Sequence, residues 1–204
     1  MSIKFIGNSN ILVIGASGSG KTTAVLKIVR NQLFDPKPDH IFYLYGAYQQ
    51  EFDDWKKDKT NPKITFISGL DLSVVDQYKD GHKLLIIDDL ILQLNKDLAQ
   101  HFIAGSSHKN TTTIFISHSL YLNNELYRLI SNNSQYIMLF KNKRNLSQVS
   151  RLGRQILGSQ YDLLVSAYKY IKAFEFVLLS FHPLVPEELL VTADYFSTCP
   201  SVFI

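Results

Sequence analysis

One motif restricts the fold of this chain more than any other feature, the glycine-rich segment Gly15–Thr22, which reads G-A-S-G-S-G-K-T. The apolar run Ile11–Ile14 precedes it, and Thr23–Arg30 has the composition of a helix. A strand, a glycine turn and a helix start in this order form a phosphate-binding loop, because main-chain N–H groups and the helix N-terminus then point at phosphate oxygens. We therefore expect the chain to bind a nucleoside triphosphate.

The loop residues have distinct expected roles. Lys21 is expected to reach the β- and γ-phosphates, and the Thr22 hydroxyl to ligate Mg²⁺. The glycines let the main chain wrap the phosphates closely. The residues expected to contact the nucleotide, which we take to be ATP, are Gly15, Ala16, Ser17, Gly18, Ser19, Gly20, Lys21, Thr22 and Thr23.

The bulk composition is that of a globular chain. Of the 204 residues, 46% are hydrophobic and 19% charged, and the formal net charge of +3 is too small by itself to indicate a nucleic-acid partner. The single cysteine, Cys199, rules out an internal disulfide and indicates a reducing compartment. No apolar run is long enough to span a membrane. We expect one soluble, intracellular domain, residues 1–204.

Basic residues gather in one part of the chain, where residues 141–161 contain no Asp or Glu. Such a cluster is either the solvated face of a helix, which is the commoner case, or a surface that contacts phosphates. Its members are Lys141, Lys143, Arg144, Arg151 and Arg154.

Short β-rich runs alternate with helical stretches, which is typical of an α/β sheet with crossover helices. The last two runs, joined through His182–Pro186, are expected to form a hairpin at the sheet edge. The prolines in Phe34–Asp39 predict a break between a helix and a strand. The predicted strands lie near Ile11–Ile14, Ile41–Tyr45, Ile64–Ile67, Leu84–Asp88, Thr112–Ser117, Tyr136–Phe140, Phe174–Phe181 and Leu189–Val191.

A second candidate site segment is Leu84–Asp89, in which four apolar residues are followed by two carboxylates. A buried parallel strand is a continuous apolar run, and ligands bind at its carboxyl end. We expect Asp88 to hold Mg²⁺ through water. Asp89 is expected to orient or deprotonate the attacking water.

The spacing of the motifs favours the RecA-like (ASCE) branch of P-loop NTPases. The strand candidate Ile41–Tyr45 lies between the P-loop and the acidic strand, and a second carboxylate follows Asp88 directly. GTPase features are missing, since Asn95–Leu98 ends in leucine where guanine recognition needs a carboxylate. We therefore expect an α/β three-layer sandwich with a mostly parallel central sheet and C-terminal edge strands.

A third strand candidate ends in the polar residues Ser117 and His118. In RecA-like ATPases this position carries a sensor of the γ-phosphate or of the attacking water, although a histidine at a strand end is as often purely structural. We expect His118 or Ser117 to be the sensor.

The aromatic residues allow two interpretations. Tyr43, Tyr45 and Tyr48 could stack on bases, but packing in the core is the favoured interpretation, and Trp55 is expected to be a half-buried helix residue. We predict no structural zinc, because the histidines have no ligand spacing with Cys199. The histidines considered are His40, His82, His101 and His108.

Several segments outside these motifs resemble viral genome-packaging ATPases of the FtsK/HerA superfamily, of the type found in Polinton-like elements and small double-stranded DNA viruses. The resemblance covers roughly residues 11–196, and its tyrosine-rich and Leu-Phe-Lys-Asn parts are more specific than the shared ATPase motifs. The segments are Ile41–Phe52, Gly105–Asn110, Ile114–Tyr121, Arg128–Asn142 and Val177–Pro183.

The resemblance implies an ATP-hydrolysing motor that packages or translocates double-stranded DNA without sequence preference. It also implies a homo-oligomeric ring, in which Lys109 or Arg128 supplies a cation to a neighbour's ATP, and a capsid protein as a partner. Such a protein would work in the cytoplasm or nucleus of an infected host cell, or with the virion. The chain departs from the family in having His118 where glutamine is usual and Asp89 where glutamate is common.

Two other functions fit a P-loop in a chain of this length. The first is a small-molecule kinase acting on nucleosides or nucleotides, although no arginine-rich lid is evident. The second is a nucleotide-binding scaffold that hydrolyses ATP very slowly, with Asp89 and His118 as degraded catalytic positions.

Overall fold

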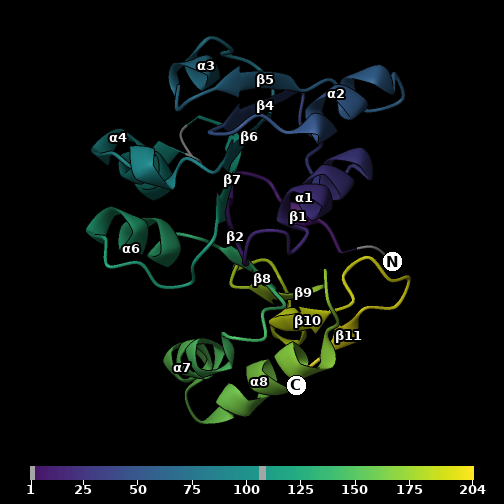
Figure 1. The fold of residues 1–204 in the computed structure, drawn as a ribbon, viewed down its shortest axis with the longest axis vertical. Helices are drawn as coiled ribbons and strands as arrows, with labels where there is room; N and C mark the ends of the chain where they lie inside the picture. Colours follow the sequence, from purple (N-terminus) through teal and green to yellow (C-terminus); the bar gives the residue numbers. More distant parts are fainter. Residues whose placement is uncertain (1–2, 106–108) are drawn as a thin grey trace.

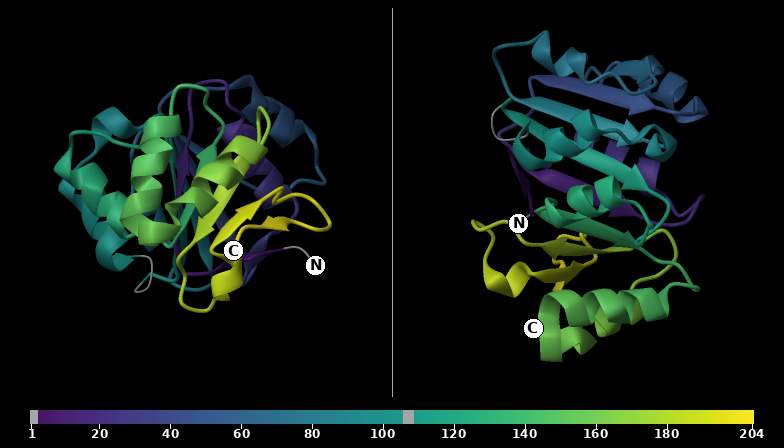
Figure 2. Two further views of the ribbon diagram at one scale, coloured as in Figure 1. Left: turned by 90° about the horizontal axis from the view of Figure 1, so that it is seen from below. Right: turned by 90° about the vertical axis from the view of Figure 1, so that its left-hand side faces the viewer.

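A nine-stranded sheet forms the centre of the computed structural model, which describes residues 3–105 and 109–204. Its strand order is β11-β10-β9-β8-β2-β7-β6-β4-β5, and Figure 2 shows the strands stacked side by side. The strands from β8 to β5 run parallel, whereas β9, β10 and β11 are added antiparallel at one edge. The strands are β2 (Asn10–Ile14), β4 (His40–Tyr45), β5 (Thr65–Ser68), β6 (Lys83–Asp88), β7 (Thr111–Ser117), β8 (Tyr136–Phe140), β9 (Phe176–Ser180), β10 (Val191–Ala193) and β11 (Ser201–Val202).

Helices cover both faces of this sheet, which gives three layers (Figure 1). One face packs against α1 (Lys21–Arg30) and α2 (Gln50–Lys57). In the described residues, no helix combines the length and the apolar character that a membrane span requires. The other face packs against α3 (Ser73–Asp76), α4 (Lys96–Gln100), α6 (Glu125–Asn132), α7 (Leu146–Leu157) and α8 (Tyr161–Tyr170).

Short elements complete the chain. A separate two-stranded parallel sheet pairs β1 (Phe5–Ile6) with β3 (Phe34–Asp35). The 3-10 turns are η1 (Ile91–Gln93), η3 (Gly158–Gln160) and η4 (Glu187–Leu189), and η2 (His101–Gly105) is a short π-helical segment.

The central strands are mostly apolar because both faces of the sheet are covered. In β6, Leu84 and Ile86 belong to the core on the α1 side, whereas Leu85 and Ile87 belong to the opposite core. This two-residue alternation follows from the pleat of a strand. The polar residues of β6 are therefore at its two ends, and Asp88 is the last residue of the strand.

The predicted fold class is confirmed, and the differences lie in short elements. The two hairpin strands are shorter or shifted relative to the prediction, and β9 and β10 do pair antiparallel as expected. The predicted break at Phe34–Asp39 also contains the strand β3. Strands β1, β3 and β11 were missed because two residues show no periodicity.

The predictions for aromatic residues were partly wrong. Tyr43 is fully buried as expected, but Tyr48 is 53% exposed, because it lies in the turn before α2, where its hydroxyl donates to Asp53. Trp55 is buried rather than half-buried. Its ring belongs to the core between α2 and the sheet, and its Nε1 donates to the Pro62 carbonyl at 3.0 Å.

Candidate nucleotide-binding site

The glycine-rich segment connects β2 to α1 at the carboxyl edge of the parallel strands, as the sequence predicts. Gly18 and Gly20 adopt φ angles of 71° and 91°, a left-handed conformation that glycine tolerates without strain. Helix α1 then begins at Lys21 with no side-chain cap. Its first N–H groups, which have no partner within the helix, are the groups that bind phosphate in such loops.

Lys21 lies beneath this loop, and its ammonium group contacts main-chain oxygens of the loop. Nζ donates to the carbonyls of Gly15 and Ala16 at 2.8 and 2.9 Å, and it lies 3.3 Å from Nδ1 of His118. Burial lowers the pKa of Lys21, and the nearby carboxylates Asp88 and Asp89 partly oppose this shift. The main-chain carbonyls of the loop thus hold the Lys21 ammonium group at the base of the loop.

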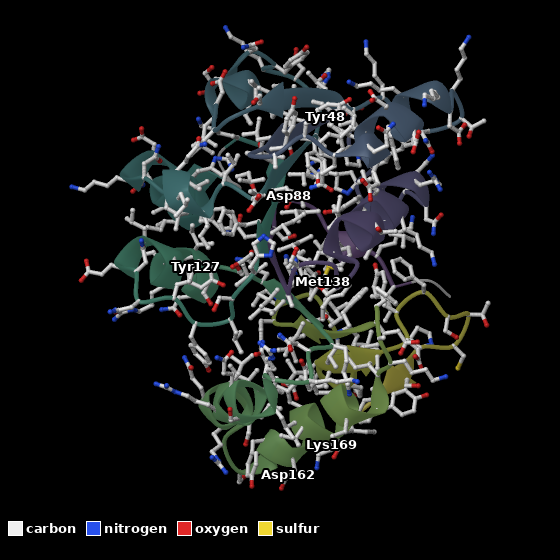
Figure 3. The ribbon with its side chains drawn as sticks, in the orientation of Figure 1. Tyr48, Asp88, Tyr127, Met138, Asp162 and Lys169 are labelled. Carbon is white, nitrogen blue, oxygen red and sulfur yellow. The ribbon has the colours of Figure 1, made fainter. Side chains whose placement is uncertain are left out.

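Asp88 is the most strongly hydrogen-bonded carboxylate of the site. Its Oδ2 accepts from the Tyr43 hydroxyl at 2.7 Å, from Thr22 Oγ1 at 3.1 Å and from Gln49 Nε2 at 3.2 Å. Asp88 is only 3% exposed, and Figure 3 shows it near the centre of the molecule, at the end of β6. Three donors on one oxygen fix the orientation of this carboxylate.

Sequence reasoning missed Tyr43 and Gln49 as members of the site. Tyr43 pairs with Ile86 in the parallel β4–β6 register, so Tyr43 and Asp88 point to the same face of the sheet. The pKa of the Tyr43 hydroxyl is raised well above its ordinary value by burial and then by the Asp88 charge, which keeps it a neutral donor. Strand alternation could have indicated Tyr43, whereas no local pattern marks Gln49.

Asp89 and His118 form the exposed half of the site. Asp89 has a φ of 55°, uncommon for a residue with a side chain. Its Oδ1 lies 3.2 Å from Nε2 of His118, and both side chains are 45% exposed. A Cβ atom on Gly46 would overlap the Asp89 carbonyl oxygen, so only glycine fits there. His118 thus contacts Lys21 through Nδ1 and Asp89 through Nε2.

These residues surround one cavity of about 440 Å³. The structure brings together nearly every residue predicted from the sequence, including Asp88, Asp89 and His118. Gly15 and Ala16 do not line the cavity, and they contribute the carbonyls that hold Lys21. Ser117 is buried and its hydroxyl donates to the Ser119 carbonyl, so His118 is the better sensor candidate. The cavity is lined by Ser17, Gly18, Ser19, Gly20, Lys21, Thr22, Thr23, Gln49, Glu51, Asp88, Asp89, His118 and Phe174.

The two candidates for a cation donated to a neighbour lie in different places. Lys109 precedes β7 and forms an ion pair with Asp76 at 2.7 Å, about 20 Å of strand away from His118 at the other end of β7. Arg128 lies on α6, which follows the carboxyl end of β7. Residues 106–108, within the segment Gly105–Asn110 that resembles the packaging ATPases, are outside the described residues, and so is His108.

Some residues of the basic cluster contact other groups of the protein, and others are exposed to solvent. Lys141 Nζ donates to the main-chain carbonyl of Lys169 at 3.1 Å, and the guanidinium groups of Arg151 and Arg154 lie over aromatic rings. Lys143 and Arg144 are exposed on the loop after β8, at the same edge of the sheet as the P-loop.

The fold and the site together define the class of the protein. A P-loop joins β2 to α1, Asp88 ends β6 and Asp89 follows it, and β7 lies between β2 and β6 in the sheet. This strand order is that of a RecA-like P-loop nucleoside triphosphatase. The strand inserted between the two motif strands is thus β7, while Ile41–Tyr45, which precedes β6 in the sequence, pairs on its far side as β4.

The chain belongs to the viral superfamily 1 RNA helicase core domain family, whose model matches residues 11–115, just over half of the chain. That span contains the P-loop, both aspartates and most of β7. No curated protein sequence matches the chain significantly.

Solved structures of viral packaging proteins are similar to this chain over nearly its full length. The genome packaging NTPase B204 from Sulfolobus turreted icosahedral virus 2, in complex with ATP-gammaS, is 12% identical, with a TM-score of 0.59 and 97% of each chain covered. The DNA-packaging ATPase B204 from Sulfolobus turreted icosahedral virus is 13% identical, with a TM-score of 0.60, covering 97% of this chain and 98% of that one. At this identity the likeness shows a common fold, which confirms the resemblance to packaging ATPases at the level of architecture.

Proposed function

We propose that the protein is an ATP-hydrolysing motor that packages or translocates double-stranded viral DNA. The observation that carries the proposal is the single cavity in which the P-loop, Asp88, Asp89 and His118 converge. The likeness in fold to B204, which covers 97% of this chain, supports the packaging role. Neither the kinase nor the scaffold alternative accounts for that likeness. We also propose that residues 1–204 act as one domain.

The chemistry follows from the positions of the charged groups. Lys21 and the loop N–H groups stabilise the charge that develops on the transferred phosphoryl group. Asp89, in contact with solvent in the cavity, orients and polarises the attacking water. His118 lies within hydrogen-bonding distance of both Lys21 and Asp89. It therefore connects the residue that contacts the γ-phosphate to the residue that orients the attacking water.

Thr22 and Asp88 fit a magnesium ion carried with the nucleotide. Mg²⁺ prefers hydroxyl, carboxylate and water oxygens, and the Thr22 and Asp88 oxygens lie 3.1 Å apart in the same cavity. Because Mg²⁺ usually keeps several of its waters, two protein ligands are enough for the proposed ion. Thr22 and Asp88 would hold this ion, which would supply positive charge that offsets the negative charge of the phosphates.

DNA and neighbouring subunits are the proposed partners. Lys143 and Arg144, exposed at the P-loop edge, contact DNA phosphates without reading sequence. In a ring, Arg128 is better placed than Lys109 to reach a neighbour's nucleotide from the carboxyl edge of the sheet, because Lys109 lies at the opposite edge in an ion pair. Such a motor works inside the infected host cell and docks on capsid protein.

The test is ATP hydrolysis by the purified protein with double-stranded DNA, with double-stranded RNA and with neither. We expect DNA to raise the rate, and salt to diminish that stimulation, because phosphate contacts release counterions. The Asp89→Asn variant should bind ATP normally and lose about 100-fold in turnover. Asp54→Asn, a change at a carboxylate that is 63% exposed in a surface ion pair, is the matched control.

The family match provides a second candidate, a motor acting on RNA. Stimulation by RNA duplex and not by DNA would replace the packaging proposal with this one. An Asp89→Asn protein that hydrolyses ATP at the unmodified rate would refute the assignment of the water-activating residue, whichever polymer stimulates.

A further inference from the structure

A second cavity of about 580 Å³ adjoins the phosphate-binding cavity. Gly20, Thr23 and Phe174 line both cavities, so the second one begins where the P-loop enters α1. Its other wall comes from the start of β9 and from the segment after β10. Figure 1 shows the segment after β10 on the same side of the sheet as α1. The volume lies within the range of small-ligand sites.

Aromatic side chains dominate this second cavity. Phe174 is 70% exposed and has a φ of 67°, an unusual conformation for a large residue. Its ring lies near the Gly20 main chain, where a Cβ atom on Gly20 would be 3.5 Å from Phe174. Phe196 forms the opposite wall, and Lys27 Nζ lies 4.1 Å from the centre of its ring. A flat ring system entering between these walls would find apolar faces.

Two carboxylates, Glu175 and Asp194, are among the polar groups that line the cavity. The turn that presents Phe174 is closed by Glu175, whose Oε2 accepts from the Lys172 N–H at 2.6 Å. Asp194 is held through Oδ2 by the Tyr170 and Ser201 hydroxyls at 2.8 and 3.0 Å. Among the described residues no hydrogen bond engages Oδ1 of Asp194, which leaves an acceptor for a ligand with an amino group.

We propose that this second cavity binds the base of the nucleoside triphosphate and selects a purine that carries an exocyclic amino group, as adenine does. Phe174 stacks on the base, because aromatic rings favour π-faces. Asp194 accepts from the amino group, and a purine with a carbonyl in that place leaves the carboxylate facing an acceptor. The inference rests on the proposed nucleotide binding but not on the proposed action on DNA.

The test compares equilibrium binding of ATP with that of inorganic tripolyphosphate, which has no base. The Phe174→Ala variant should weaken ATP binding about tenfold, as expected for loss of one stacking partner, and leave tripolyphosphate binding unchanged. Leu184→Ala, a truncation of another exposed apolar side chain near the C-terminal edge, should change neither affinity. The unmodified protein should also bind ATP more tightly than inosine triphosphate, which lacks the amino group.

Each outcome decides the proposal. Unchanged ATP affinity in Phe174→Ala, or equal weakening of ATP and tripolyphosphate, would overturn the base site, since the second result would mean that Phe174 only supports the P-loop. Equal affinity for ATP and inosine triphosphate would overturn the selection by Asp194. Failure of the unmodified protein to bind tripolyphosphate at all would instead refute the proposed phosphate-binding function, and the base site with it.

Discussion

Strand β7 carries polar side chains at both ends, and the two ends differ in what those groups can do. At the amino end, the Thr112 hydroxyl lies 2.9 Å from His82 Nε2, and the Thr113 hydroxyl 2.8 Å from His101 Nε2. All four residues are buried. Burial lowers the pKa of His82 and lowers that of His101 to about 4, so both histidines are neutral hydrogen-bonding groups at physiological pH.

At the carboxyl end the polar groups contact one another and also line a cavity. His118 contacts Lys21 and Asp89, and both His118 and Asp89 are 45% exposed. A buried histidine whose partners come from its own fold contributes to stability. Both ring nitrogens of His118 also have protein partners, but these contacts border an open cavity, where a bound ligand can take the place of a partner. The comparison shows that residue type does not distinguish the two roles, but access to the cavity does.

The largest expected effect tests whether the carboxyl end is the chemical end. Lys21→Ala removes the cation at the base of the P-loop, and ATP turnover should fall by about 100- to 1,000-fold. Steady-state hydrolysis measures this. Lys57→Ala, which removes the same charge from a side chain that is 72% exposed, should hydrolyse ATP normally. A comparable loss in both variants would mean that overall charge, and not the site, determines the rate.

The next effect tests whether the amino end is structural. Because the pKa of His101 is lowered to about 4 by burial and by Lys109, the unfolded chain takes up the proton first as pH falls. The contribution of neutral His101 to the free energy of unfolding should therefore be fully present above pH 6.5. It should decline by about 3 kcal/mol as the pH falls to 4. Urea denaturation across this range measures the decline.

The variant His101→Gln should flatten this pH dependence while leaving turnover near neutral pH unchanged, since glutamine can still bond to Thr113. A His101→Gln protein with normal pH dependence and poor turnover would show that the two ends are not separable in this way.

The smallest effect concerns a residue that joins the core to the site. Tyr43→Phe keeps the buried ring and removes one of the donors to Asp88. Outer donors of this kind typically change metal affinity by about tenfold or more, so the magnesium concentration that supports half-maximal turnover should rise about tenfold. Tyr136→Phe, which loses the hydrogen bond from the Ile6 N–H and lines neither cavity, should leave the magnesium requirement unchanged.

The sequence predicted most of the parallel sheet because its signals are local. The P-loop motif, the apolar run that leads to Asp88 and the strand that precedes His118 each consist of contiguous residues. Gln49 and Phe174 could not be identified, because they reach the cavity through tertiary packing of a turn and an edge segment. The burial of Trp55 and the exposure of Tyr48 depend likewise on how α2 and its preceding turn lie on the sheet.

The hydrogen bonds of Lys21 have a consequence for the hydrolytic cycle. Its ammonium group donates to two loop carbonyls, so a phosphate that binds there competes with the loop for the same cation. These carbonyls offset part of the attraction between Lys21 and the phosphate, because one ammonium group has only three N–H donors. A motor that must release its hydrolysis product at every step benefits from such a loop, because tight retention of phosphate would limit its speed.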